Sequence, residues 1–522
     1  MGDLAFDYII IGSGFGGSVS ALRLVEKDYR VLILEQGSEL RAKDFPKTNW
    51  NLKRWLWAPR IGFRGLFRIE PFRHMTVVAG AGVGGGSLVY ANTLPIPKDG
   101  FFQSPAWAHL ADWKTELAPH YQTARRMLGA LPTDFESPAD LVLRAVAADR
   151  GTPGAYEKPH LAILMGDSGR TIPDPYFGGA GPSRTPCHRC GCCMTGCRHD
   201  GKNTLDKNYL HLARRRGLQL EADTEVVKVS PLPGGGYRVA AQQGRGMFFR
   251  RQVQYTAQRV IFAAGALGTN RLMLKLKQDS NALPRLSDQL GRRVRTNSEA
   301  LIFVTVPGPG IDYSAGVALN SLLQVDEHSH LEMSSYGPGS GFFRLSALPH
   351  VPGASSWLLR LARMLLALLA HPIRTLRAMS VWDWAKHTMI LLYMRSVEGT
   401  LRFERGSFGR LVTRLEGEAP KAQIPEASQL AFEMAQKTGG VVMSSFIDTL
   451  FNTPVTAHVL GGCTMGDSPE TGVIDTQHRV FGYDGLYVID GSTISANPGV
   501  NPALTIAALA ERAMSFIPSR RA

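Results

Sequence analysis

Five of the six cysteines fall within one eleven-residue segment, 187–197. Four of them are separated by two, two and three residues, the spacing that bacterial ferredoxins use for thiolates around an iron–sulfur cluster. These four are Cys187, Cys190, Cys193 and Cys197. Arg198 stands where a proline usually follows the fourth cysteine, and Cys192 or Cys463 could replace one of the four. The pattern predicts an iron–sulfur cluster, with structural zinc or a metal-free loop of packed thiols as alternatives.

A second group of residues is suited to hold a nucleotide. An apolar run, 6–11, is followed at once by a turn with four glycines and then by apolar residues at helical spacing. Gly12 allows a tight turn, Gly14 allows a pyrophosphate to approach the backbone, and Gly17 allows the helix to pack on the strand. Glu35, which ends the next apolar run, would bind the ribose hydroxyls of an adenosine. This order predicts a dinucleotide site rather than a glycine-rich turn without a ligand.

A parallel sheet must position these residues. The runs 6–11 and 31–34 have the continuous apolar character of strands that are buried on both faces. From about residue 218 the pattern changes to short strands, expected at 221–229, 237–242 and 259–264. Gly265 follows the last of them and opens another helix. The predicted fold class is therefore α/β, with a Rossmann-like dinucleotide-binding domain.

Composition excludes several classes of protein. The chain has 522 residues, 44% hydrophobic and 20% charged, unlike a disordered, collagen-like or multi-span membrane protein. Its net charge of +14 favours anionic partners such as anionic lipid or an acidic redox protein, or serves solubility alone. No nucleic-acid-binding motif accompanies this charge, so no nucleic acid partner is expected. The N-terminus lacks the pattern of a signal peptide, which predicts a cytoplasmic protein with reduced thiols.

Motifs along the whole chain resemble the glucose–methanol–choline (GMC) oxidoreductase family. GLYVIDGS at 485–492, NPGVNPALTI at 497–506 and HVLGGC at 458–463 are similar to the family signatures. GAGVGGGSLVYAN at 80–92 resembles the family's second flavin loop. KNTLDKNYL at 202–210 has a counterpart in the branch that contains the bacterial cholesterol oxidases. Several independent motifs in the family's order argue against a chance agreement.

The resemblance implies FAD as the cofactor, with a discontinuous Rossmann-like FAD-binding domain and an interleaved α+β substrate domain. The expected FAD-binding segments are 1–45, 75–100, 218–300 and 455–522. The expected substrate-domain segments are 46–74, 101–217 and 301–454, with a lid and the cysteine-rich loop 187–197. The residues expected to hold FAD are Gly12, Gly14, Gly17, Glu35, Gly85, Ser87, Asn92, Val226, Gly265, Asp490, Gly491, Asn501 and Pro502.

The resemblance also implies the catalytic pair. His458 matches the family's catalytic histidine, and Asn501 stands 43 residues later, where the family has a histidine or an asparagine. An alcohol would lose a hydride to flavin N5 while His458 takes the hydroxyl proton and Asn501 orients the oxygen. The expected function is oxidation of a sterol or another apolar, long-chain alcohol to a carbonyl. The alternatives are a relative with non-redox lyase activity and an electron-transfer or binding flavoprotein without its own alcohol substrate.

One departure from the family pattern concerns a second acid–base group. Characterised cholesterol oxidases place a carboxylate on a substrate-domain strand for isomerisation of the steroid double bond. The approximate register puts His387 at this place, and no acid is evident nearby. We therefore expect oxidation to be kept and isomerisation to be lost, with His387 as a candidate second base.

Two segments raise the question of where the substrate comes from. Residues 50–73 mix tryptophan and arginine, and Trp357–Ala370 is apolar but too short and too charged to span a bilayer. Either segment could simply cover the core. Alternatively, both could form a lid for an apolar substrate drawn from an anionic membrane, with the protein at the inner membrane surface.

The electron acceptor depends on the cysteines. An iron–sulfur cluster would take electrons singly from the reduced flavin and pass them to a cytochrome or quinone. Without a cluster, oxygen is the expected acceptor.

Overall fold

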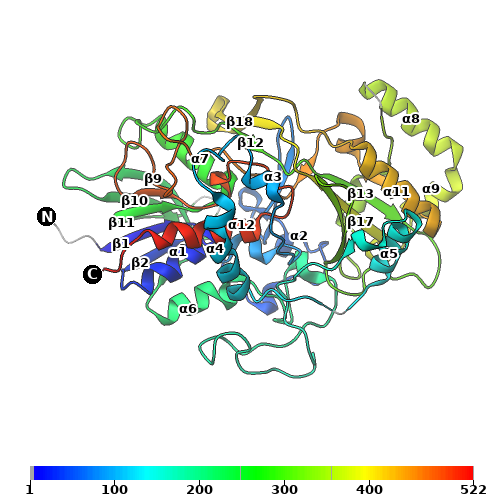
Figure 1. Cartoon of the computed structure of the whole chain (residues 1–522), viewed down its shortest axis with the longest axis horizontal. Coiled ribbons are helices and arrows are strands. Elements are labelled where there is room, and N and C mark those ends of the chain that lie inside the picture. The colour runs from blue at the N-terminus through cyan, green and yellow to red at the C-terminus, as the bar shows by residue number, and fades with distance from the viewer. Residues whose placement is uncertain (1–4, 134, 247–248, 354–355, 521–522) are drawn as a thin grey trace.

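The computed structural model describes residues 5–133, 135–246, 249–353 and 356–520. Two large sheets and several small ones form its frame (Figure 1). The first sheet has the strand order β8-β2-β1-β11-β10-β9, with β22 paired to β11. Its strands are β1 (Phe6–Ile11), β2 (Val31–Leu34), β8 (Gln219–Glu221), β9 (Thr224–Pro231), β10 (Tyr237–Gln243), β11 (Arg251–Phe262) and β22 (Leu486–Val488).

The centre of this sheet has the parallel strand pairing that was predicted for a Rossmann-like domain. β1 pairs in parallel with β2 on one side and with β11 on the other, and every residue of β2 is buried. The helices beside this sheet are α1 (Phe15–Val25), α4 (Trp113–Met127), α6 (Tyr209–Arg215), α7 (Gly265–Lys277) and α12 (Ala503–Ser515). The first of the later strands was expected to begin at 221, but β9 begins at Thr224 after the short β8.

A buried polar network joins three of these helices. Arg23 of α1 donates two hydrogen bonds to Glu511 of α12, at 2.7 and 2.9 Å. Tyr209 of α6 donates its hydroxyl to the same carboxylate at 2.6 Å. The paired, hydrogen-bonded carboxylate is the arrangement that a buried charge requires. The network fixes the C-terminal helix against the N-terminal βα unit.

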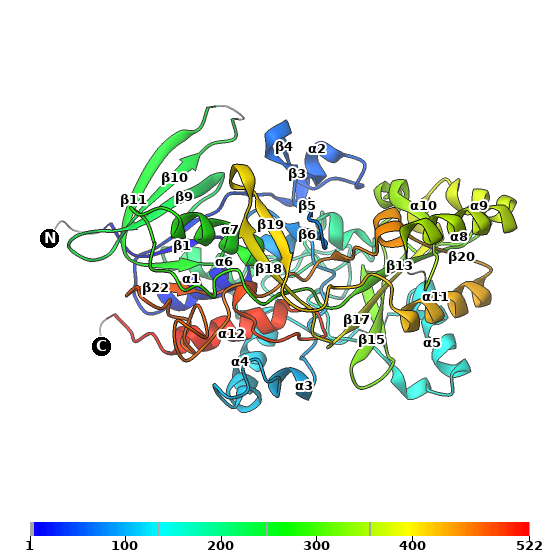
Figure 2. The same cartoon turned by 90° about the horizontal axis from the view of Figure 1, so that it is seen from above.

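The second large sheet is antiparallel, with the order β16-β20-β13-β17-β15-β14-β7. Its strands are β7 (Tyr156–Glu157), β13 (Ala300–Thr305), β14 (Leu319–Gln324), β15 (Ser329–Ser334), β16 (Ala347–Pro349), β17 (Thr388–Arg395) and β20 (Val441–Ser445). In Figure 2, α5 (Pro138–Asp149) and α11 (Pro425–Thr438) cover one face, and α8 (Trp357–Ala370), α9 (Pro372–Met379) and α10 (Trp384–His387) lie over the other. The alternation along β13 agrees, since Ile302 packs toward α11 and Phe303 toward α10.

The tryptophan- and arginine-rich segment 50–73 folds into a short helix and short strands. It contains α2 (Leu52–Trp55), β3 (Trp57–Ala58), β4 (Phe63–Arg64) and β5 (Phe67–Pro71). Trp55 is fully buried and stacks on Phe67 with ring centroids 4.6 Å apart. Strands this short carry little periodic signal, so packing against neighbouring aromatic rings decides the local structure. Trp55, Trp57, Leu66 and Phe67 of this segment are buried, whereas Trp50 and Ile61 are exposed.

The remaining elements are small. Two three-stranded sheets have the orders β21-β6-β5 and β12-β18-β19. Their strands are β6 (Thr76–Gly80), β12 (Val294–Arg295), β18 (Thr400–Arg405), β19 (Leu411–Leu415) and β21 (Val455–Thr456), and α3 spans Asp99–Phe102. No helix in the described part of the chain, α8 included, is long and apolar enough to cross a membrane. The boundaries of the two expected domains stay a prediction.

Candidate active site

The first glycine loop leaves a space at the start of α1. Gly12 has φ +101°, and a Cβ atom there would lie 2.5 Å from the Ala263 carbonyl oxygen. A Cβ atom on Gly17 would lie 2.1 Å from the Gly12 carbonyl oxygen, so both glycines are needed for close packing. At Gly14, by contrast, a Cβ atom would meet nothing within 4 Å. The backbone N–H groups at this helix start therefore border open space, as an anion site requires.

Glu35 lies at the end of β2, beside this loop. One carboxylate oxygen accepts hydrogen bonds from the N–H and hydroxyl of Ser13 at 3.0 and 2.8 Å, and the other accepts the Gly37 N–H at 2.8 Å. Burial raises its pKa, against these hydrogen bonds. Thr224 donates its N–H to the Glu35 carbonyl at 2.8 Å, which brings the start of β9, with the buried Val226, to the same place.

The second glycine loop lies against the first. A Cβ atom on Gly85, where φ is +52°, would lie 2.8 Å from the Gly14 Cα atom. Ser87 is buried, donates to the Gly84 carbonyl at 2.7 Å and accepts the Leu205 N–H at 3.1 Å. Asn92 is fully buried with φ +74°; its amide interacts with the Cys193 thiol, and its side-chain oxygen has no hydrogen-bond partner among the described residues. A buried amide oxygen without a partner points to a group that the protein binds.

The C-terminal motif is the third segment that borders the open space at Gly14. Asp490 is buried and accepts hydrogen bonds from the Ser492 N–H and hydroxyl and from the Thr269 hydroxyl, at 2.8, 2.6 and 2.5 Å. Burial raises its pKa, although these donors oppose the change. A Cβ atom on Gly16 would lie 1.8 Å from the Ile489 carbonyl oxygen, so the Asp490–Gly491 pair touches the first loop.

The starts of α7 and α12 lie beside the same space. Gly265 opens α7 with φ +73° and has nothing within 4 Å of an added Cβ, and Pro502 precedes α12. The open cradle, the unpartnered asparagine oxygen and the helix starts fit a dinucleotide such as FAD.

His458 is oriented by a carboxylate that sequence reasoning missed. Its Nδ1 atom lies 2.7 Å from the Glu299 Oε2 atom, and the Glu299 Oε1 atom accepts the Ala457 N–H at 3.0 Å. The Glu299 side chain is fully buried, whereas that of His458 is 12% exposed. With Nδ1–H donating to Glu299, the Nε2 atom of His458 is free to accept a proton.

The pairing of neighbouring segments explains the contact between His458 and Glu299. His458 follows β21, which pairs in parallel with β6, the strand that leads into the second glycine loop. The backbones of Arg295 and Leu460 exchange hydrogen bonds of 2.9 and 3.0 Å, which places Glu299 opposite His458. Burial lowers the pKa of His458, but the charges of Glu299 and Glu332 outweigh burial and raise it above its ordinary value.

A second missed carboxylate lies beside Asn501. The Asn501 side-chain N–H donates to the Glu332 Oε2 atom at 3.2 Å, and the Asn501 side-chain oxygen has no partner among the described residues. Glu332 is fully buried on β15. Because β13 and β15 both pair with β17, Leu301 and Glu332 face Leu392 from its two sides. The carboxylates of Glu299 and Glu332 are thus brought to one end of the site.

No carboxylate was evident from the sequence near the expected catalytic pair, but the structure has one beside Asn501. Glu332 supplies a carboxylate on a strand of the second sheet, whereas the Nδ1 atom of His387 contacts the Val306 carbonyl at 2.9 Å. In the sequence, the only sign of this carboxylate is a glutamate inside the short segment SHLEMS. In the structure this segment is a strand with all six residues buried. For Glu299 the signal is weaker, since it stands just before the apolar strand β13.

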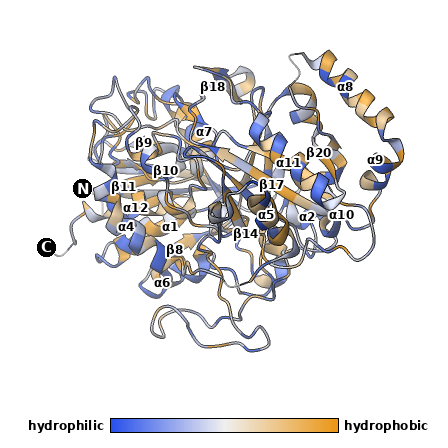
Figure 3. Ribbon diagram, turned by 45° about the vertical axis from the view of Figure 1, so that its right-hand side comes forward, coloured by the Kyte–Doolittle hydropathy of each residue, from blue (hydrophilic) through white to orange (hydrophobic). Residues whose placement is uncertain are grey.

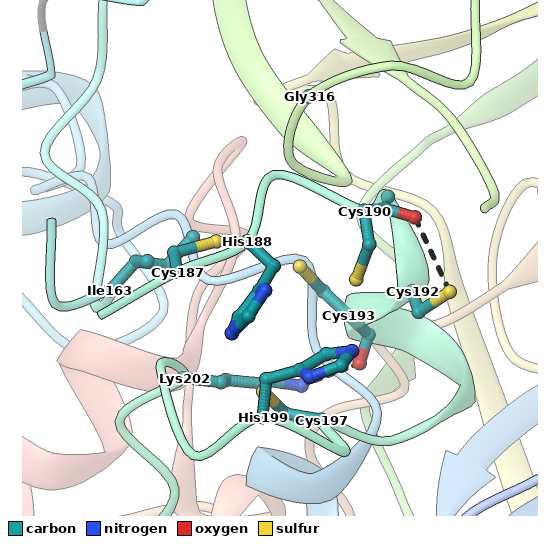
Figure 4. Close-up of a pocket in the computed structure, with 11 residues that line it drawn as sticks. Ile163, Cys187, His188, Cys190, Cys192, Cys193, Cys197, His199, Lys202 and Gly316 are labelled. Atoms are coloured by element: carbon teal, nitrogen blue, oxygen red, sulfur yellow. Dashed lines mark hydrogen bonds between the residues drawn. The ribbon is translucent and has the colours of Figure 1, made fainter. Parts of the chain in front are cut away.

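The cysteines of the ferredoxin-like spacing line one pocket (Figure 4). Cys187, Cys190, Cys193 and Cys197 border it together with Cys192, His188, His199 and Lys202. Cys192 differs from the others because its thiol points to the Cys190 carbonyl, 3.3 Å away. Cys463 lies elsewhere, 3.9 Å from the sulfur of Met273 on α7. Within the described ranges, no group of three or more His, Cys, Asp or Glu residues is arranged to hold a metal ion.

Lys202 connects this pocket to the second glycine loop. It is almost fully buried, and its ammonium group donates to the carbonyls of Leu88 and Cys193 at 3.0 and 2.9 Å. Burial lowers its pKa to about 8. Burial also raises the pKa of Cys187 to about 12 and raises that of Cys193, which favours neutral thiols in the absence of a bound cation.

Comparison with known proteins places this geometry in one family. Family models described as GMC oxidoreductase match residues 182–280 and 410–510, and a model described as an NAD(P)-binding Rossmann-like domain matches 10–56. The chain is 42% identical to a cholesterol oxidase from Acinetobacter baumannii over 99% of this chain and 95% of that protein. It is also 42% identical to a cholesterol oxidase from Mycobacterium tuberculosis, over 99% and 91% of the two chains.

A solved structure with low sequence identity has the same fold. Pyridoxine 4-oxidase from Mesorbium loti superposes with a TM-score of 0.61 over 98% of this chain and 99% of that one, at 16% identity. The chain therefore belongs to the GMC oxidoreductase family, in the branch that contains bacterial cholesterol oxidases, and is an FAD-dependent alcohol oxidoreductase.

Proposed function

We propose that the protein oxidises the hydroxyl group of a sterol to a ketone, with His458 as the base and Asn501 as the residue that orients the oxygen. The observation that carries this proposal is the buried constellation of the two residues, each held by its own carboxylate. The relatives named cholesterol oxidase support a sterol as the alcohol. Neither a lyase nor an electron-transfer flavoprotein is favoured by these relatives.

Each side chain has a defined task in this reaction. FAD, when bound, supplies the acceptor for the hydride that leaves the carbinol carbon. The free Nε2 atom of His458 accepts the hydroxyl proton, and the negative charge of Glu299 stabilises the imidazolium that results. Asn501 uses its unpartnered oxygen or its N–H to hold the substrate oxygen in line with His458.

The cofactor is assigned to the two glycine loops and the C-terminal motif. The pyrophosphate would lie in the open space at Gly14, and Glu35 would hold the adenosine ribose beside Val226. The side-chain oxygen of Asn92 would gain in the flavin region the partner that it lacks within the protein. The other residues assigned to FAD are Gly12, Gly17, Gly85, Ser87, Gly265, Asp490, Gly491, Asn501 and Pro502.

Glu332 gives the site a second acid–base group. Its carboxylate is buried next to Asn501, so a substrate oxidised there would present its new carbonyl and the neighbouring carbon to Glu332. A carboxylate in this position can take a proton from that carbon and return it to the far end of a double bond. We therefore assign isomerisation of an unsaturated steroid ketone to Glu332.

Oxygen is the proposed electron acceptor, as the name oxidase of the relatives suggests. A cluster that passes electrons to a cytochrome or quinone is the second candidate, because all four cysteines of the ferredoxin-like spacing line one pocket. The relatives named cholesterol oxidase favour the first candidate. For an apolar substrate we also propose peripheral contact with an anionic membrane.

Replacing Gly14 with valine should abolish FAD binding, because the side chain would fill the space proposed for the pyrophosphate. The flavin absorbance of the purified variant measures the loss. Gly154→Val is the matched control, since a Cβ atom at Gly154 also meets nothing within 4 Å, and it should keep FAD. Full FAD content in Gly14→Val would contradict the assignment of the loop.

His458→Ala should keep FAD and slow anaerobic bleaching of the flavin by a sterol about 10²–10⁴-fold, the usual contribution of a general base. Bleaching within a few-fold of the wild-type rate would rule out His458 as the base.

Glu299→Gln tests the positioning carboxylate in the same assay. It removes a charge that raises the pKa of His458, so that pKa falls. Since the neutral imidazole is the base, the acidic limb of the kcat/KM profile should move to lower pH; an unmoved limb would argue against this role.

Glu332→Gln should separate oxidation from isomerisation. We expect the ultraviolet absorbance of the conjugated ketone to appear at least about 10²-fold more slowly, while peroxide is still formed from the sterol. Glu327→Gln, at an 84% exposed position before the same strand, should change neither product. Unchanged formation of the conjugated ketone by Glu332→Gln would assign isomerisation elsewhere.

Protein prepared without oxygen from iron-replete cells should contain FAD but no stoichiometric iron, zinc or acid-labile sulfide, and its turnover should yield peroxide. Iron and sulfide in a fixed ratio to FAD would instead establish the cluster. In that case Cys190→Ser should lose both and keep FAD, because Cys190 borders the pocket and not the glycine loops.

A further inference from the structure

We propose that α8 and α9 form a surface that docks on an anionic lipid bilayer. Of the 23 large hydrophobic side chains that are exposed among the described residues, nine lie between residues 357 and 382. This docking surface comprises Trp357, Leu358, Leu359, Leu365, Leu366, Leu369, Ile373, Leu376 and Trp382. A contiguous exposed apolar patch on a globular protein marks a surface that is covered by something else.

Helix α8 is oriented opposite to an ordinary surface helix. Its buried residues are Arg360 and Met364, whereas Leu366 and Leu369 are 63% and 75% exposed. The guanidinium of Arg360 points inward and donates to the Leu450 carbonyl at 3.3 Å. Figure 3 shows the hydrophobic colour of α8 at the outer edge of the molecule. An amphipathic helix that turns its leucines outward is suited to lie in a lipid interface.

The chain segment that carries this surface has charged residues of one sign. No aspartate or glutamate occurs between residues 333 and 382, a segment that contains arginines at 344, 360, 363, 374 and 377. The exposed Arg363 and Arg374 donate to backbone carbonyls of Pro352 and Gly440 at 3.2 and 2.7 Å, which holds them beside the apolar residues. Arginines at the border of an apolar patch complement anionic headgroups. Two copies of this surface would bring like charges together, so a lipid bilayer fits it better than a second chain.

The position of the surface links it to the substrate sheet. α8 contacts β16 and α9 contacts β20, and Figure 1 shows both helices projecting at the edge of the molecule farthest from the first sheet. β16 and β20 belong to the same sheet as β15, which carries Glu332. Trp357 at the start of α8 and the 98% exposed Trp382 after α9 add two exposed indole rings, which suit the headgroup level of a bilayer. That the bilayer also delivers the substrate rests on the proposed function; the docking itself does not.

Vesicle flotation of the FAD-loaded protein tests the proposal. Binding to phosphatidylcholine vesicles that contain phosphatidylglycerol should exceed binding to pure phosphatidylcholine vesicles, and salt should weaken it. Leu366→Glu with Leu369→Glu should lower binding to the anionic vesicles at least about tenfold, because two apolar side chains leave the interface. Leu415→Glu, at a 53% exposed position on β19, is the matched control and should bind like the wild type.

Two further arms separate the specific surface from the general positive charge. Arg377→Gln should weaken binding to anionic vesicles more than Arg216→Gln, at an exposed position after α6. Quenching of tryptophan fluorescence by brominated lipid should decrease in Trp357→Phe with Trp382→Phe. Equal losses for both arginine variants, or quenching that is unaffected, would overturn the assignment of the surface.

Two further measurements separate lipid docking from self-association and from the proposed function. A dimer in solution that becomes monomeric in the Leu366/Leu369 variant would assign the surface to a second copy and overturn the proposal. Sterol oxidation in detergent micelles tests the proposed function separately. We expect the Leu366/Leu369 variant to keep wild-type turnover in micelles and to lose turnover on vesicles.

Discussion

Three segments that are far apart in the chain meet at the first glycine loop with no space for a methyl group. A Cβ atom on Gly12 would collide with Ala263, one on Gly16 with Ile489, and one on Gly17 with Gly12 itself. This close approach brings β1, the end of β11 and the C-terminal motif to one point, and it leaves the space at Gly14 open. The proposed placement of the cofactor depends on this contact.

Sequence patterns predicted the parts of the site that are local. The bounds of β1 and β2 are as expected, because continuous apolar runs that are buried on both faces leave little choice of structure. The strands in the tryptophan- and arginine-rich segment were not predicted, because they are two to five residues long and depend on contacts such as that of Trp55 with Phe67. The length of α8 was predictable from its apolar run, but its outward orientation depends on the contact of Arg360 with Leu450.

The two carboxylates illustrate what a single sequence cannot supply. Glu299, just before β13, and Glu332, on β15, stand 33 residues apart; β13 and β15 are not neighbours, but both strands pair with β17. The two carboxylates lie close together because of how their strands are aligned on β17. The hydrophobic pattern of a strand does not determine its alignment with a strand two places away in the sheet. His458 and Asn501 were expected to act together on family resemblance alone. The carboxylates give a physical reason for their orientation, because each holds one of them in a fixed hydrogen bond.

The network of Arg23, Glu511 and Tyr209 has a consequence for the order of events during synthesis. Ten of the eleven residues of α1 are buried, and α12 lies against it although Glu511 follows Arg23 by 488 residues in the chain. The N-terminal βα unit thus emerges from the ribosome without the elements that cover it, and several hundred residues must follow before it can be enclosed. A nucleotide site that includes the C-terminal motif is complete only after those residues have been added to the chain. Until then the nascent chain must keep its apolar first helix from aggregating.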